Sequence, residues 1–163
     1  MSKSVSVKTW EVGQDPTWVL DALSSVEDKG ENYQSDVRHG VQQMITRGVL
    51  DSYSIVYRDG EMISGAGTRP HVWADGVHDF CYQIAVRGFR IPQDGLNQDY
   101  FTLDILVPEQ VARGRKLGYE KCIISFNLHN ERLKRNLDRN WKYPRESSGP
   151  HKVNGIPQWI YIF

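Results

Sequence analysis

The chain has 163 residues, of which 39% are hydrophobic and 25% charged, so we expect one globular domain over residues 1–163 with its own core. Lysine plus arginine and aspartate plus glutamate number 20 each, and this balance argues against binding nucleic acid or a membrane surface through bulk charge. No apolar run approaches the roughly 18 residues of a membrane span. The opening MSKSVSVKTW lacks the apolar segment of a signal peptide. We therefore expect a cytoplasmic protein.

The first elements alternate between strand and helix patterns. Residues 4–12 alternate β-branched and polar residues, which predicts a strand. Asp15 as N-cap and Pro16 in the first turn then begin a helix. A second helix is expected from Ser35 to Gly48, since the glycine can end it.

A hairpin is the clearest local prediction. Asp59-Gly60 separates two alternating runs within residues 52–68, as in a type I′ turn. Gly65 and Gly67 in the second run indicate a bulge or a close backbone approach. A long strand is expected next, over residues 77–91.

The second half alternates helices and strands. A helix is expected over 100–117, and Pro108 either kinks it or restarts it at a new first turn. A strand over 119–126 and a helix over 130–141 follow, and a turn with a closing strand ends the chain. Cys81 and Cys122 lie in apolar strand runs and are expected to be reduced and buried. Two cysteines provide neither a disulfide framework nor a metal quartet, so no metal site is expected.

The predicted order is β-α-α-β-β-β-α-β-α-β-β, an α/β (α+β) chain whose central mixed sheet is flanked by helices. Hairpin-linked strands are antiparallel, and the strands joined across the later helix are parallel. The crossover places helix N-termini at one sheet edge, where anionic ligands bind. Charge is uneven along the chain: residues 113–145 carry 10 lysines and arginines against 3 acids. This segment is either a solvated basic face or a docking surface for an anionic ligand or partner.

Two stretches resemble the GNAT acetyltransferase family. YQIAVR (82–87) resembles the fourth strand of the family, whose backbone pairs with the pantetheine arm of acetyl-CoA. ARGRKLGYEKCIISFNLHN (112–130) resembles its run of basic helix, Leu-Gly-Tyr and fifth strand. The resemblance implies that strands four and five splay apart and that the cofactor enters between them. The cofactor-binding residues that it implies are Ile84, Ala85, Val86, Arg87, Arg90, Gly95, Asn127 and Asn130.

The sequence departs from the family pattern at the pyrophosphate loop. The family has Gln/Arg-x-x-Gly-x-Gly/Ala after the fourth strand, whereas this chain has RGFRIPQDGLNQDY with Gly95 but no matching triplet. Arg87, Arg90 or the basic residues 113–116 are the alternative sources of positive charge for the phosphates.

A second departure concerns the proton donor. The family pattern Asn-x-x-Ala-x-x-x-Tyr is matched by Asn130-x-x-Leu133-x-x-x-Leu137, and leucine cannot protonate a leaving thiolate. Either Tyr143 or Tyr161 replaces that tyrosine, or the thiolate leaves unassisted. Such departures resemble divergent members of the fold, including some encoded by bacteriophages.

Amine acetylation also needs an oxyanion donor and a base. A main-chain N–H within residues 84–86 can serve as the donor. Asp79 and Glu61 are the candidate bases, with His78 as an alternative, and a carboxylate would need a raised pKa to work near neutrality. Arg69, His71 and Trp73 are candidates for the wall of a substrate cleft.

Two functional hypotheses follow. The first is an acyl-CoA-dependent N-acyltransferase that transfers acetyl from acetyl-CoA to an amine of a small molecule or a protein. The second is a catalytically inactive protein of the same fold that binds or inhibits a protein partner. The altered loop and Leu137 favour the second hypothesis. Cofactor binding discriminates between the two.

Overall fold

The computed structural model describes residues 4–27, 37–70, 81–91, 101–127, 131–140, 147–153 and 156–162. Seven strands form one sheet in the order β1-β2-β3-β4-β5-β7-β6. The strands are β1 (Val5–Glu11), β2 (Ser52–Arg58), β3 (Glu61–Pro70), β4 (Tyr82–Arg90), β5 (Cys122–Asn127), β6 (Ser147–Val153) and β7 (Ile156–Ile162). The helices are α1 (Thr17–Glu27), α2 (Val37–Thr46), the π-helical η2 (Phe101–Leu106), α3 (Val107–Lys116) and α4 (Glu131–Asn140).

The predicted element order and mixed sheet are confirmed. Strands β1 to β4 pair antiparallel in sequence order, and β4 pairs with β5 in parallel across η2 and α3. Strand β7 then pairs antiparallel with both β5 and β6. A βαβ crossover thus joins the antiparallel part of the sheet to its last three strands.

The predicted hairpin turn is also confirmed. Asp59 and Gly60 have φ angles of 53° and 82°, and a type I′ turn requires positive φ at both central residues. The Asp59 carboxylate further accepts a hydrogen bond of 3.0 Å from the backbone N–H of Ser4, ahead of β1. The turn therefore also ties the chain start to the sheet.

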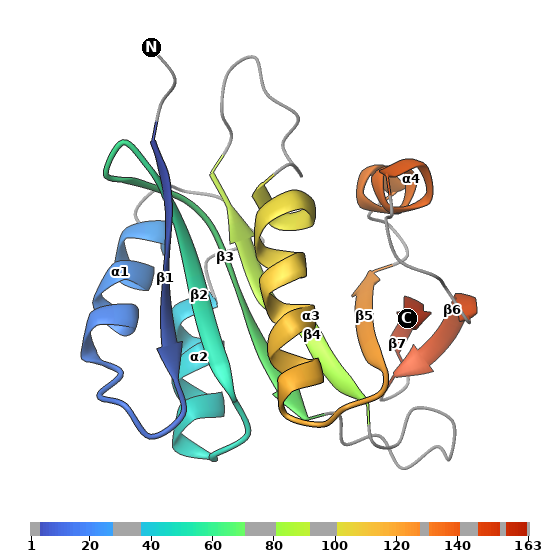
Figure 1. Cartoon of the computed structure of the whole chain (residues 1–163), viewed down its shortest axis with the longest axis horizontal. Coiled ribbons are helices and arrows are strands. Elements are labelled where there is room, and N and C mark those ends of the chain that lie inside the picture. The colour runs from blue at the N-terminus through green and yellow to red at the C-terminus, as the bar shows by residue number, and fades with distance from the viewer. Residues whose placement is uncertain are drawn as a thin grey trace.

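Helices cover the two faces of the sheet in separate layers. Figure 1 shows α3 in front of the sheet and α2 behind it. Buried side chains of α1 and α2 pack against β1, β2 and β4, and the central members of this cluster are Val19, Leu23, Val41, Tyr53, Ile55, Val86 and Phe89. On the opposite face, α3 and α4 pack against β4 and β5 through Tyr82, Ile84, Val107, Val111, Cys122, Ile124 and Leu137. Strand β4 therefore contributes to both cores.

The second half differs in detail from the expected elements. The helix expected over 100–117 is divided into η2 and α3, and Pro108 lies in the first turn of α3. A proline, which lacks an N–H, is tolerated in a first turn. Leu106 has the helical angles φ −71° and ψ −47°, so η2 runs directly into α3, and Pro108 marks the change from π- to α-helix. The strand expected over 77–91 is described from Tyr82 to Arg90, and residues 71–80 lie outside the described residues.

Both cysteines are free and buried, as predicted. Within the described part of the chain, no helix is both long and apolar enough to cross a membrane.

Candidate functional site

Strands β4 and β5 pair over only two residue positions. Tyr82 pairs with Cys122 and Gln83 with Ile123, and the described ladder ends there. On its other side, β5 pairs with β7 over five positions. From Ile84 onward the edge of β4 that faces β5 therefore lacks a ladder partner among the described strands, at the carboxyl ends of two parallel strands. This is the sheet edge at which open α/β folds bind ligands.

Strand β4 is irregular where it leaves β5. Ala85 and Arg87 have φ angles of 55° and 51°, a left-handed conformation that is uncommon for residues other than glycine. The register with β3 shifts twice across the same stretch, between the pairs of Gly65, Gly67 and Arg69. Such bulges re-aim backbone groups and side chains and are frequent beside functional sites.

Gln110 on α3 holds this bulge from one face. Its side-chain oxygen accepts a 2.9 Å hydrogen bond from the Ala85 N–H, and its side-chain nitrogen donates one of 3.1 Å to the Ala66 carbonyl. Gln110 is only 2% exposed. One buried amide thus satisfies a donor of β4 and an acceptor of β3 that the bulge removes from the ladder.

Tyr53 on β2 holds the bulge from the other face. Its hydroxyl donates a 2.8 Å hydrogen bond to the Arg87 carbonyl. Burial raises the pKa of this hydroxyl well above its usual value, so the group stays a donor over the physiological range. The two anchors explain how non-glycine residues keep a strained backbone here.

Gly65 and Gly67 allow β3 to approach its neighbours, as the sequence indicated. A Cβ at Gly65 would lie 2.4 Å from Cε1 of Phe89, and one at Gly67 would lie 2.9 Å from a methyl of Leu50 and a ring carbon of Tyr53. Neither distance is tolerable for carbon atoms. The glycines are therefore required by packing around the bulge.

A polar network fixes the opposite end of β4. The Tyr82 hydroxyl donates to the Asp51 carboxylate and lies 2.6 Å from Thr68 Oγ1. Arg113 Nε lies 2.7 Å from the same carboxylate, and its Nη1 lies 3.0 Å from Glu11. Burial and the bond to Asp51 raise the pKa of Tyr82 well above its usual value. The network keeps β4 aligned with β2 and β3 just before it diverges from β5.

Two of the three basic residues in 113–116 are engaged within the protein. Arg113 pairs with two carboxylates, and Arg115 donates to the Tyr119 and Glu120 carbonyls. Both arginines lie in the last turn of α3, where cations interact favourably with the helix dipole. In the chain, η2 comes between β4 and α3. The basic turn therefore lies at the end of α3 that is further along the chain from β4, about 15 Å from the start of α3.

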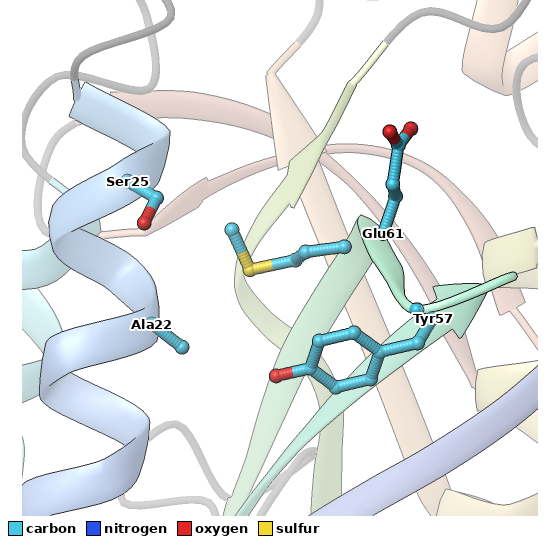
Figure 2. A pocket seen from close by; sticks show the side chains of 6 residues that line it. Ala22, Ser25, Tyr57 and Glu61 are labelled. Carbon is cyan, nitrogen blue, oxygen red and sulfur yellow. The ribbon is translucent and has the colours of Figure 1, made fainter.

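Glu61 lies apart from the bulge. It begins β3, whereas Val86 pairs with Gly67 six residues further along, a separation of about 20 Å along a strand. Glu61 borders a pocket of about 390 Å³ between α1 and the hairpin. Figure 2 shows Tyr57 directed toward Ala22 and Ser25 of α1, and the Glu61 carboxylate directed away from Tyr57. The structure therefore does not bring Glu61 together with residues 84–86.

The other predicted site residues divide into those near the opening and those outside the described residues. Ile84 and Val86 are buried, Ala85 and Arg90 are half-buried, and Arg87 is exposed. Asn127 ends β5 and pairs with Gln158 of β7. Asp79, His78, Tyr143, Gly95 and Asn130 lie outside the described residues, as do His71 and Trp73.

Leu137 is a core residue. It is fully buried on α4 and belongs to the cluster that includes Ile124 of β5 and Val111 of α3. An apolar side chain at this position stabilises the contact between α4 and the sheet. It provides no proton donor at the position that the family pattern assigns to tyrosine.

Sequence reasoning missed the two anchors of the bulge and the Asp51 network. Gln110 and Ala85 are 25 residues apart in the sequence, and Arg113 and Asp51 are 62 apart. No local pattern connects residues at such separations. Within the described residues, no group of three or more His, Cys, Asp or Glu side chains is arranged to hold a metal ion.

No protein-family model matches the sequence, and no curated protein sequence does. Solved structures do match over almost the whole chain. One is an acyl-CoA N-acyltransferase from Pseudomonas aeruginosa, with 14% identity, a TM-score of 0.56 and coverage of 98% of this chain and 99% of that one. A GNAT family acetyltransferase from Brucella melitensis in complex with acetyl-CoA has 14% identity, a TM-score of 0.56 and coverage of 97% and 87%.

A third match is the aminoglycoside N-acetyltransferase AAC(6')-Iy in complex with CoA. It has 12% identity, a TM-score of 0.62 and coverage of 94% of this chain and 97% of that one. At such identities the likeness concerns the fold, and it extends through both halves of the sheet. The chain is therefore a divergent protein with the GNAT fold.

Proposed function

We propose that the protein is an acyl-CoA-dependent N-acyltransferase that binds acetyl-CoA between β4 and β5. The observation that carries this proposal is the end of the β4–β5 ladder after two residue pairs, beside the bulge at Ala85 and Arg87. The edge of β4 after Gln83, which has no ladder partner among the described strands, offers backbone groups to the amide-containing pantetheine arm. The CoA and acetyl-CoA complexes of proteins with this fold support the same assignment.

The reaction consists of one bond made and one broken. The lone pair of a neutral amine attacks the thioester carbonyl, the C–N bond forms, and the C–S bond breaks to release the CoA thiolate. The amine nitrogen loses a proton, and the thiolate takes one up. The donor for the developing oxyanion is an N–H of β4. Because the Ala85 N–H is bonded to Gln110, Ile84 and Val86 are the remaining candidates.

The phosphates of the cofactor require a separate site. We place them beside Arg90 and the segment that contains Gly95, which precedes the N-terminus of η2, the end of the helical stretch that favours anions. The basic turn at Arg113 and Arg115 is excluded from this role because its charges are engaged at the other end of α3. Asn127 and Asn130, between β5 and α4, are proposed to contact the pantetheine.

The acid–base residues are proposed from outside the described residues. Asp79 and Tyr143 keep the roles of base and acid that the sequence suggested, since Glu61 is distant and Leu137 is buried in the core. The acceptor is an amine of a small molecule or a protein, and we place the enzyme in the cytoplasm as a single domain.

One alternative has specific support. Leu137 provides no proton donor, and Gln110 already binds the Ala85 N–H. A catalytically inactive protein that binds a protein partner would tolerate both features. It would have no reason to bind acetyl-CoA.

Calorimetric titration with acetyl-CoA, free CoA and desulfo-CoA separates the two candidates. We expect acetyl-CoA to bind with a micromolar dissociation constant, and free CoA to bind within about tenfold of it, since most of the contacts are with the shared arm. Absence of binding at millimolar acetyl-CoA, by protein whose circular dichroism shows it to be folded, would support the alternative.

A further inference from the structure

Two arginines lie on adjacent strands beside the bulge. Arg69 of β3 pairs in register with Gln83 of β4, and Arg87 follows four residues later on β4. Arg69 is half-buried, and its Nε donates a 2.6 Å hydrogen bond to the side-chain oxygen of Gln83. A guanidinium has five N–H donors. The bond to Gln83 uses one of them and fixes the orientation of the group.

The second guanidinium lies against α2. A Cβ at Gly40 would be 3.2 Å from Nε of Arg87 and 3.3 Å from its Cζ, so the absence of a side chain at Gly40 makes room for the guanidinium. The left-handed backbone of Arg87 aims the side chain there, and the bond from Tyr53 to its carbonyl holds that conformation. Arg87 therefore lies on the α2 face of the sheet, opposite α3.

Arg69 lies opposite Gln83, just ahead of the bulge, and Arg87 belongs to the bulge itself. Burial, and then the charge of Arg87, lower the pKa of Arg69. No carboxylate among the described residues pairs with either guanidinium. Arg113, by contrast, pairs with both Asp51 and Glu11. Two guanidinium groups that pair with no described carboxylate remain available to a ligand, and guanidinium groups bind carboxylate or phosphate strongly.

We infer that Arg69 and Arg87 bind an anionic group of the acceptor, so that the substrate class is an amine carrying a carboxylate or a phosphate. This inference rests on the proposed function, because the arginines flank residues 84–86, where the thioester would lie. Arg87 then contacts the acceptor rather than the CoA phosphates. An anion held at the α2 face would place an amine a few bonds away next to the bulge.

Three amines that share one aminoethyl group test the charge requirement. O-phosphoethanolamine carries a phosphate, β-alanine carries a carboxylate, and ethanolamine carries neither. Their binding is measured by calorimetry in the presence of CoA, and their acetylation by release of free thiol from acetyl-CoA. We expect at least one of the two anionic amines to bind at least tenfold more tightly than ethanolamine. Which one does so distinguishes a phosphate site from a carboxylate site.

Substitution of the two arginines tests whether they form the anion site. Arg69→Gln and Arg87→Gln should each reduce the preference for the anionic amine at least tenfold, and should leave acetyl-CoA affinity within about twofold of the unsubstituted protein. Arg58→Gln is the matched control, since Arg58 is also half-buried on a strand but lies at the far end of β2. Arg69→Lys keeps the positive charge but loses the forked donors of the guanidinium. It should therefore keep part of the preference for the anionic amine that Arg69→Gln loses.

The outcomes separate this inference from the proposed function. If acetyl-CoA binds but the three amines bind equally, or if Arg69→Gln and Arg87→Gln keep the preference, the inference is wrong and the proposed function stands. If acetyl-CoA does not bind while the anionic amines still bind in an arginine-dependent way, the anion site stands and the acyltransferase assignment fails. If neither acetyl-CoA nor the anionic amines bind, both the inference and the proposed function are wrong.

Discussion

At the scale of single residues, Gln110 is the side chain on which the candidate site depends most. It is buried on α3, and its amide satisfies one donor on β4 and one acceptor on β3. Leaving such buried groups without partners costs about 1–3 kcal/mol each. Gln110 of α3 therefore acts as a positioning residue that holds the bulge between β3 and β4 in place.

Replacement of Gln110 by glutamate gives a pH-dependent test. A protonated glutamic acid can both accept from Ala85 and donate to Ala66, whereas a carboxylate can only accept and is desolvated. The folded-state pKa of the introduced carboxyl group should thus be raised above its unfolded value of about 4.3. A raised folded pKa gives stability that is present below about pH 4 and lost as pH rises. We expect Gln110→Glu to match the unsubstituted protein near pH 4 and to be less stable by about 2 kcal/mol at pH 7.

Urea unfolding at both pH values measures this difference. Gln42→Glu on the exposed surface of α2 is the control, and its effect should stay within about 0.5 kcal/mol at either pH. If Gln110→Glu were as stable as the unsubstituted protein at pH 7, the two hydrogen bonds of Gln110 would not hold the bulge.

At the scale of elements, β4 combines three environments in nine residues. Its first residues pair with β5, its middle bulges against β3, and Phe89 near its end returns to the α1–α2 core. The close contact of Phe89 with Gly65 couples β3 to this last part. Packing across the two strands should therefore be sensitive to a single methyl group.

Gly65→Ala tests that coupling. The added Cβ would lie 2.4 Å from the Phe89 ring, and overpacking of this kind costs about 1–3 kcal/mol. Gly88→Ala is the matched control, since a Cβ there meets no atom closer than 3.5 Å. We expect thermal unfolding to show a lower melting temperature for Gly65→Ala only, with partial recovery in the double variant with Phe89→Leu. Equal melting temperatures of the two alanine variants would contradict the packing described here.

The sequence predicted elements better than it predicted the site. Asp59-Gly60 and the alternating runs identified the hairpin because turn chemistry and strand period are local properties. The bulge was not predictable from local sequence, since Ala85 and Arg87 carry no preference for positive φ and are held by Tyr53 and Gln110 from other elements. The same limitation applies to Arg69. The sequence suggested that Arg69 lines a cleft, but no local pattern placed it near Arg87.

At the scale of the whole molecule, the proposed site is one opening in a continuous seven-stranded sheet. The Asp51 network fixes β4 where it still pairs with β5, and the bulge directs it away immediately afterwards. The proposed cofactor arm would occupy the position that further β4–β5 pairing would otherwise fill. The acceptor would approach from the α2 face, where Arg87 lies. Arg69 is bonded to Gln83, which alternates along β4 with Tyr82 and Ile84 of the α3 face.

The most direct test of this arrangement is amide hydrogen exchange with and without acetyl-CoA. We predict that acetyl-CoA slows exchange at residues 84–90 of β4 and at the end of β5, because the pantetheine arm accepts hydrogen bonds from those amides and covers them. Strand β1, at the far edge of the sheet, should be unchanged. If bound acetyl-CoA left the β4 amides as exposed as before and protected another part of the chain, the gap between β4 and β5 would not be the cofactor site.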